Sequence, residues 1–149
     1  MNLHRALLAV VLSLAAAPAL AQEKLVAIKG VVSGSPESVS FSGNAKVSSR
    51  YAPDPDFNRP RLVLTIDLTS VAGVGSSSGA KYVVYGPELV GRQLAASHAV
   101  EVTFPFKSVK AAASATPRTG VASFVLDFDV STGALTRAAG NVSSPNFPR

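Results

Sequence analysis

The chain has 149 residues, of which 47% are hydrophobic and only 15% are charged, and its formal net charge is +5. This composition indicates one folded globular domain and excludes a disordered or highly charged chain. The sequence contains no cysteine, which excludes disulfide bonds, thiolate metal sites and a cysteine nucleophile.

Residues 1–21 have the three parts of a secretory signal peptide. A basic start around Arg5 precedes a short apolar run, and Ala19-Leu20-Ala21 matches an A-x-A cleavage site. The apolar run is shorter than the ~20 residues that span a bilayer. We therefore expect cleavage before Gln22, export to the periplasm or the extracellular space, and a single mature domain at 22–149.

Apolar and polar residues alternate along most of the mature segment, which is typical of strands with one buried face. In chain order, this alternation predicts strands at 25–32, 39–47, 62–69, 81–85, 88–94, 100–106, 123–130 and 134–143. The mature segment shows no sustained helical period. We therefore predict an all-β fold, a single antiparallel β-sandwich or small β-barrel of about seven to eight strands.

Glycine and proline separate the predicted strands. Turns are expected at 34–37, 86–87 and 131–133, and the last of these should close a hairpin. Longer linkers are expected at 51–60, 72–80 and 108–120. Long loops on a compact scaffold often carry function, so 51–61 and 108–120 are the segments where we expect a binding surface.

Every catalytic motif in the sequence is incomplete. The segment 75–79 fits G-x-S-x-G, but that motif needs a strand-to-helix turn, and a strand is predicted to follow it. His98 is the only histidine of the mature segment, which excludes a multi-histidine zinc site. Asp127 and Asp129 share a strand face, but there is no tryptophan to line a sugar cleft. The balance is against an enzyme, and we expect no catalytic residue, metal or cofactor.

The prolines around 53–60 enclose closely spaced charges. Asp54, Asp56 and Asn58 have the alternate spacing of calcium ligands, but Arg59 stands where an EF-hand loop has glycine, and both Arg59 and Arg61 would repel a cation. A solvated turn is the better interpretation. Strand pairing could still gather charged side chains here, and the candidate ligand-binding residues are Arg50, Asp54, Asp56, Arg59 and Arg61.

The leading hypothesis is a soluble exported domain that acts by binding, without chemistry of its own, on a small ligand, an envelope component or another protein. Its basic residues are scattered, so we expect no nucleic-acid partner, and the mature chain offers no stable membrane anchor.

Two alternatives remain. Residues 25–32 alternate with Gly30 in register and resemble the N-terminal extension of chaperone–usher pilins, which implies a structural subunit that lends this strand to the next subunit. The cysteine pair that many such pilins carry is absent. The other alternative is a small outer-membrane β-barrel, which shares the alternation, although only three tyrosines and no tryptophan are available for aromatic girdles.

Overall fold

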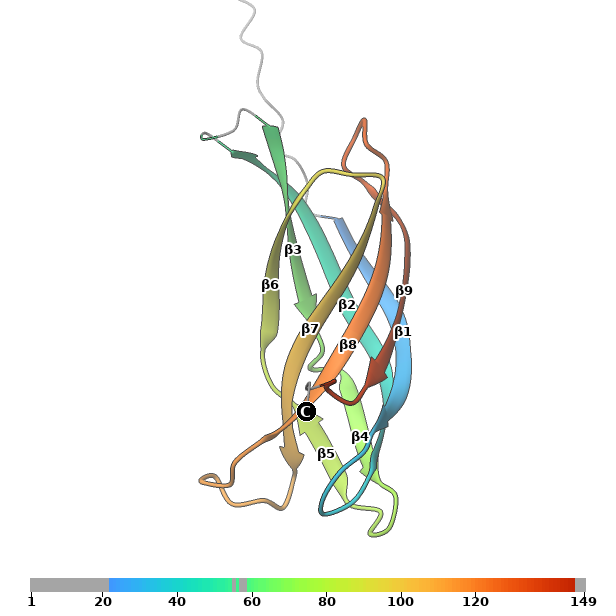
Figure 1. Ribbon diagram of the computed structural model, residues 1–149, viewed down its shortest axis with the longest axis vertical. Helices are drawn as coiled ribbons and strands as arrows, with labels where there is room; N and C mark the ends of the chain where they lie inside the picture. The colour runs from blue at the N-terminus through green and yellow to red at the C-terminus, as the bar shows by residue number, and fades with distance from the viewer. Residues whose placement is uncertain (1–21, 55, 57–58, 147–149) are drawn as a thin grey trace, which may run out of the picture.

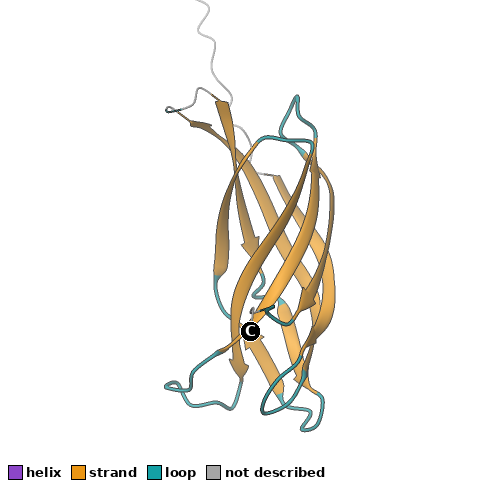
Figure 2. Ribbon diagram, in the orientation of Figure 1, coloured by secondary structure: helices purple, strands orange, loops and turns teal. Residues whose placement is uncertain are grey.

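The computed structural model describes residues 22–54, 56 and 59–146, so the expected signal peptide lies outside the described residues. All the regular elements that it describes are β-strands (Figure 2). The all-β prediction is therefore confirmed. The strands are β1 (Gln22–Val32), β2 (Val39–Asp54), β3 (Arg59–Asp67), β4 (Val71–Gly75), β5 (Lys81–Val84), β6 (Pro87–Gln93), β7 (Ser97–Ser108), β8 (Arg118–Phe128) and β9 (Leu135–Ser143).

The nine strands form one sheet that curls into a barrel-like fold (Figure 1). Neighbouring strands follow the order β1-β9-β8-β7-β5-β4-β2, and β1 also pairs with β2, which closes the ring. Strands β3 and β4 lie one after the other along β2, both antiparallel to it, and together act as one long, interrupted strand. Strands β5 and β6 form a second interrupted strand, because β5 pairs with β4 and β6 pairs with β3. An up-and-down path of seven long strands makes the first and last parallel, and β1 indeed meets β9 in parallel at Gly30 and Val142.

The chain changes neighbours at Gly86 and Pro87. Below this point in Figure 1, β5 pairs with β7, whereas above it β6 pairs with β3. Gly86 has a φ of 73°, a left-handed conformation that glycine adopts readily, and Pro87 begins β6. The barrel is therefore closed in its lower half and lacks a β6–β7 ladder among the described strands of its upper half.

Alternation places one face of each strand in a common core. Phenylalanine rings fill its centre: Phe41 meets Phe106 edge to face with ring centroids 4.9 Å apart, and it meets Phe104 at 5.5 Å. Phe124, Leu126 and Phe128, which the period of β8 places on one face, are all buried. Side chains therefore occupy the barrel interior, and the surfaces open to a ligand are the outer faces and the loops.

Two linker predictions are wrong, because residues 51–54 and 59–60 belong to the paired ends of β2 and β3, and residues 72–80 contain most of β4. The inward positions of this strand include Gly73 and Gly75, so its own side chains give almost no hydrophobic signal. A Cβ atom at Gly73 would meet the Phe41 ring, and one at Gly75 would meet the carboxylate of Glu37. Larger side chains from other parts of the sequence fill the space beside the glycines of β4. They, and not side chains of β4 itself, cover the inner face of this strand.

Residues 25–32 lie within β1, which pairs antiparallel with β2 along its whole length, from Gln22 opposite Ser49 to Val32 opposite Val39. Gly43 lies in the same ladder, where a Cβ atom would meet the backbone of Ser70 and Val71. This glycine therefore marks a close approach of two chain segments.

Candidate functional site

Glu37 ties the loops together at the lower end of the barrel. Its carboxylate accepts hydrogen bonds from the backbone N–H groups of Ser77 and Ser78, both at 2.9 Å, and from the Ser78 hydroxyl. Tyr82 donates its hydroxyl to Oε1 at 3.1 Å. These hydrogen bonds, the one from the Ser78 side chain first, lower the pKa of Glu37 to about 2. The ionised carboxylate thus holds the β1–β2 loop against the β4–β5 turn.

Arg118, the first residue of β8, fixes the end of the β7–β8 loop. Its Nη1 donates to the Glu37 carbonyl at 2.8 Å, and its guanidinium lies over the Phe106 ring, with Cζ 5.0 Å from the centroid. Its Nη2 is buried and has no hydrogen-bond partner among the described residues. Burial, and then the hydrogen bond with Glu37, raises the pKa of Tyr82, which keeps this hydroxyl protonated as a donor. These contacts make the lower end a fixed scaffold.

The outer face of β4, β5 and β7 beside this scaffold is both apolar and basic. Register places Val83 opposite Lys107 and Val74 opposite Lys81. The Lys107 ammonium lies 5.5 Å from the centroid of the Tyr85 ring, in cation–π geometry. We call this surface the basic face, and its residues are Val74, Lys81, Val83, Tyr85, Lys107, Val109 and Lys110. Its four hydrophobic members are among the exposed large hydrophobic residues, with Val109 60% exposed.

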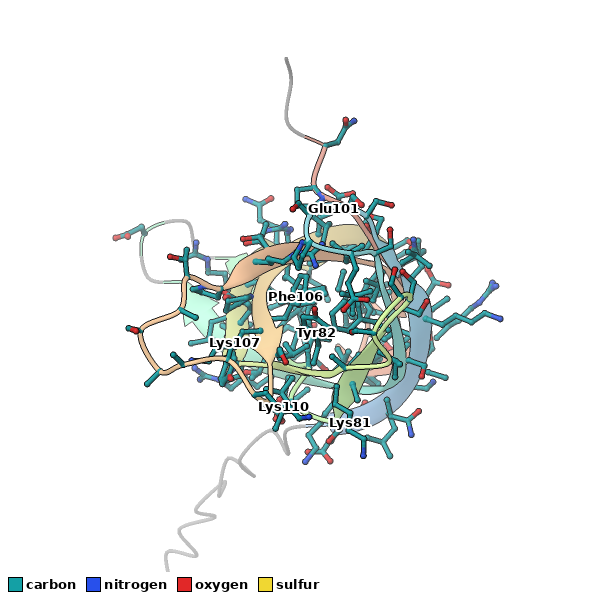
Figure 3. All side chains as sticks on the ribbon, turned by 90° about the horizontal axis from the view of Figure 1, so that it is seen from below. Lys81, Tyr82, Glu101, Phe106, Lys107 and Lys110 are labelled. Carbon is teal, nitrogen blue, oxygen red and sulfur yellow. The ribbon has the colours of Figure 1, made fainter. Side chains whose placement is uncertain are left out.

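Two grooves open on the basic face, and residues of the β7–β8 loop line both of them. The larger, of about 450 Å³, is lined by the β4–β5 turn together with Lys81, Val109 and Lys110. The other, of about 310 Å³, lies between Tyr85, Lys107 and the alanines and proline of the loop. Figure 3 shows the three lysines around the lower end, on the side that faces away from Glu101. Apolar walls with cations at the rim suit a ligand that is itself apolar in part and anionic in part.

The charge of the basic face is uncompensated by neighbours in the sequence. Segments 68–87 and 102–126, which supply β4, β5, the lower part of β7 and the β7–β8 loop, contain Lys81, Lys107, Lys110 and Arg118 but no aspartate or glutamate. The Glu37 carboxylate also reaches this end, and the β4–β5 turn and Tyr82 already occupy its oxygens. The three lysines therefore present a net positive surface.

Comparison with protein-family models, curated proteins and solved structures gives no match to this chain. Within residues 22–54, 56 and 59–146, no helix is long and apolar enough to cross a membrane. In the same part of the chain, no group of three or more histidine, aspartate and glutamate side chains is placed to hold a metal ion. The site must therefore be judged on its own geometry.

The charged residues singled out in the sequence lie on the β2–β3 hairpin, at the end of the barrel opposite the basic face (Figure 1). Backbone register places Asp54 opposite Arg59 and Ala52 opposite Arg61, while the side chains of Asp54 and Arg59 lie outside the described part. Arg50 and Arg61 are exposed on the outer face, and Arg50 lines a groove of about 220 Å³ with Tyr51 and the β8–β9 turn. Their role in ligand binding stays a prediction.

The G-x-S-x-G segment is the turn of the β4–β5 hairpin, in which Gly79 has a φ of 66°. A strand follows it, as the sequence indicates, and the Ser78 hydroxyl is held by Glu37. His98 Nε2 donates to the Gln93 carbonyl at 2.7 Å, so the ring bridges β6 and β7. Hydrogen bonds from the Ser131 hydroxyl, and then from the Ser131 backbone N–H, lower the pKa of Asp129. The Asp129 carboxylate therefore stabilises the β8–β9 turn.

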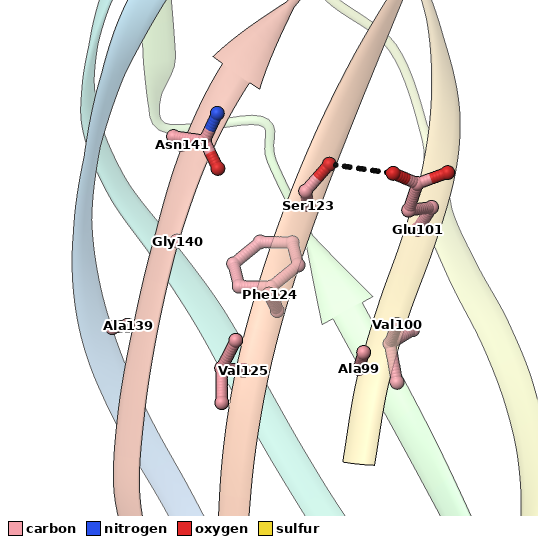
Figure 4. Close-up of a pocket in the computed structure, with 9 residues that line it drawn as sticks. All are labelled: Ala99, Val100, Glu101, Ser123, Phe124, Val125, Ala139, Gly140 and Asn141. Carbon is pink, nitrogen blue, oxygen red and sulfur yellow. Dashed lines mark hydrogen bonds between the residues drawn. The ribbon is translucent and has the colours of Figure 1, made fainter.

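Another groove, of about 290 Å³, crosses the outer face of β7, β8 and β9 (Figure 4). Outward positions there are small, with Ala99 and Ala139 flanking the exposed Val125. The Ser123 hydroxyl donates to Glu101 at 3.1 Å, so the carboxylate of this groove already has a partner. This groove combines an anionic rim with mostly small outward side chains. Its lining includes the ring of Phe124, which is buried, but no lysine or arginine.

Only part of the basic face can be recognised from the sequence. The 108–120 loop was expected to carry a binding surface, and it does line both grooves. Lys81 and Tyr85 come from a separate strand, and only the pairing of Val83 with Lys107 brings them to that loop. The absence of acidic residues from 68–87 and 102–126 was visible in the sequence and is the pattern that points to this face.

Proposed function

We propose that this protein is an exported binding protein without chemistry of its own, and that its basic face holds an anionic ligand with an apolar portion, such as a component of the cell envelope. The observation that carries the proposal is the set of three lysines around exposed Val83, Tyr85 and Val109, in segments 68–87 and 102–126, which contain no aspartate or glutamate. Exposed apolar patches rimmed by polar groups commonly mark interaction sites. Lysines at the rim would attract the anionic group, and Tyr85 with the valines would cover the apolar portion.

The scaffold beneath the basic face supports a binding role. Glu37 and Arg118 hold the β4–β5 turn and the β7–β8 loop before any ligand arrives. Preorganised loops lower the entropy lost on binding. The carboxylate of Glu37 is ionised at neutral pH and its oxygens are occupied by donors, so this residue supports the loops and is poorly suited to proton transfer.

Three probes test the proposal on the mature chain by NMR titration. Dodecyl phosphate carries both an anionic group and an apolar chain, dodecyl maltoside carries only the chain, and inorganic phosphate carries only the charge. We expect dodecyl phosphate, below its micellar concentration, to bind more tightly than either of the others and to shift signals of Tyr85, Lys107 and Val109. Added salt should weaken binding because the lysines are exposed. Equal affinity for dodecyl phosphate and dodecyl maltoside would refute the role of charge.

A matched pair of triple variants separates the basic face from general positive charge. Replacing Lys81, Lys107 and Lys110 by glutamine should weaken dodecyl phosphate binding at least about tenfold, or about 1.4 kcal/mol. The chain offers a control with the same change in charge, because Lys24, Lys29 and Lys46 lie on β1 and β2. Their replacement by glutamine should leave the affinity within about twofold. An equal loss in both variants would show that net charge alone drives binding.

A further inference from the structure

Strand β6 is an exposed edge in the upper half of the barrel. It pairs with β3 on one side, and on the other side no described strand forms a ladder with it. The Cα atoms of β6 and β7 lie more than 8 Å apart along nearly all of their length. Leu89 is 71% exposed, and Gly91, which has only backbone to expose, is also exposed. An accessible, unpaired edge of this kind is a template for another strand.

Three observations show which backbone groups face the free edge. Pro87 stands opposite Asp67 and has no N–H, so its backbone must point away from β3. The Gly91 carbonyl accepts a hydrogen bond from Arg92 Nη1 at 2.9 Å, and the Gln93 carbonyl accepts one from His98 of β7. The direction of the backbone N–H and C=O groups alternates from one residue to the next along a strand. The residues whose backbone groups point to the free edge, which we call the outward set, are therefore Pro87, Leu89, Gly91 and Gln93.

We propose that two copies of this chain associate by antiparallel pairing of β6 with β6, about a two-fold axis at Val90. In this register Leu89 lies opposite Gly91 of the second copy, and both belong to the outward set, so they exchange two hydrogen bonds. The two-fold axis repeats that pair. Pro87, which lacks a donor, falls opposite Gln93, whose carbonyl is already occupied by His98. The order of donors and acceptors along β6 is therefore complementary to itself.

The side chains of β6 fit the same register. Glu88 lies opposite Arg92 of the second copy, and the axis creates the reciprocal pair, so the two charges that an isolated β6 carries are both matched. The exposed Leu89 lies beside Gly91, the residue with the least side chain to obstruct it. In one copy alone, Arg92 binds its own Gly91 carbonyl, which it would release to Leu89 of the second copy. In the isolated chain, the Arg92 side chain thus occupies a carbonyl of the free edge that the second copy would bind.

Charge reversal tests the register directly, by sedimentation velocity of the mature chain at up to about 1 mM, a range that detects dissociation constants of that order. The wild-type chain should form a dimer, and Glu88→Arg and Arg92→Glu should each weaken association at least about tenfold by opposing like charges. An equimolar mixture of the two variants should dimerise again, because every pair in the mixed dimer is opposite in sign. Lys29→Glu, an exposed reversal on β1, should have no effect. A monomeric wild-type chain, or a mixture that stays monomeric, would overturn the proposal.

A crosslink checks the position of the axis, and the cysteine-free chain makes this simple. Val90→Cys places two thiols opposite each other at a pair of the close, non-hydrogen-bonded kind, within disulfide range. Leu89→Cys leaves them staggered and should crosslink much less under the same mild oxidant. Equal crosslinking of the two variants would exclude this register. The dimer uses a surface separate from the basic face, so its failure would leave the proposed function intact.

Discussion

Replacing Phe106 by alanine should remove the centre of the lower core. Its side chain is 0% exposed, and its ring meets Phe41, Tyr82 and Phe104 with centroids 4.9, 5.9 and 6.0 Å away. Burial of about 150 Å² at about 25 cal/mol per Å² corresponds to about 4 kcal/mol. Buried Phe→Ala changes cost about 3–5 kcal/mol in general. With three aromatic neighbours and the Arg118 guanidinium above the ring, we expect the upper end of that range.

Guanidinium-induced unfolding of the mature chain, followed by circular dichroism, measures this loss. Phe106→Leu keeps most of the volume, so it should cost about 1–2 kcal/mol, and the difference between the two variants isolates the cavity. Val125→Ala, a truncation at an exposed outward position, should change stability by less than about 0.5 kcal/mol. A loss below about 1.5 kcal/mol for Phe106→Ala would show that the ring is not packed as described.

Three further outcomes are expected. The pKa of Glu37 is about 2 in the folded chain against an ordinary 4.5. The stabilisation of the folded chain by this carboxylate is therefore complete above about pH 4.5 and disappears as the pH falls toward 2. Glu37→Gln should flatten this part of a pH–stability profile. Gly30→Ala should lower the free energy of unfolding by about 3 kcal/mol or more in chemical denaturation, because a Cβ atom there collides with the Val142 backbone. At Gly79 a Cβ atom faces open space, so Gly79→Ala should cost only the ~1–2 kcal/mol of placing alanine in a left-handed conformation. Intact-mass measurement of protein from the envelope of an expressing host should give a chain that begins at Gln22; an uncleaved chain would refute the predicted signal peptide.

The regular strands were predictable because each carries its own signal. Phe124, Leu126 and Phe128 alternate with polar residues, and this alternation alone places them on one buried face of β8. The turn at 131–133 was readable from its glycine, since Gly133 has a φ of 70° and closes the β8–β9 hairpin. Such features depend on neighbours in the sequence, which is why the fold class followed without any knowledge of the pairing.

Strand β4 and the basic face were not predictable for the opposite reason. The inward positions of β4 are small because the Phe41 ring and the Glu37 carboxylate take their space, and nothing local to the 72–80 segment records this. The basic face depends on Val83 lying opposite Lys107, a pairing of residues 24 positions apart in the chain. A shift of one residue in that register would turn one set of side chains to the other face. The proposed binding surface follows from register, which the alternation of a single sequence does not specify.

The two proposed surfaces have a joint consequence. Strands β5 and β6 form one interrupted strand, with Val83 on the basic face and Val90 at the proposed axis seven residues later. Antiparallel pairing at Val90 would keep the outer faces of both copies on the same side and would place the two basic faces about 45 Å apart, at a rise of about 3.3 Å per residue. Two sites at that spacing cannot share one small ligand, but they can grip a surface or polymer that repeats the ligand, with a gain from effective concentration. The charge-reversed monomer Arg92→Glu should therefore bind free dodecyl phosphate as the wild-type chain does, yet lose retention on vesicles that contain it. Equal retention would mean that each basic face acts alone.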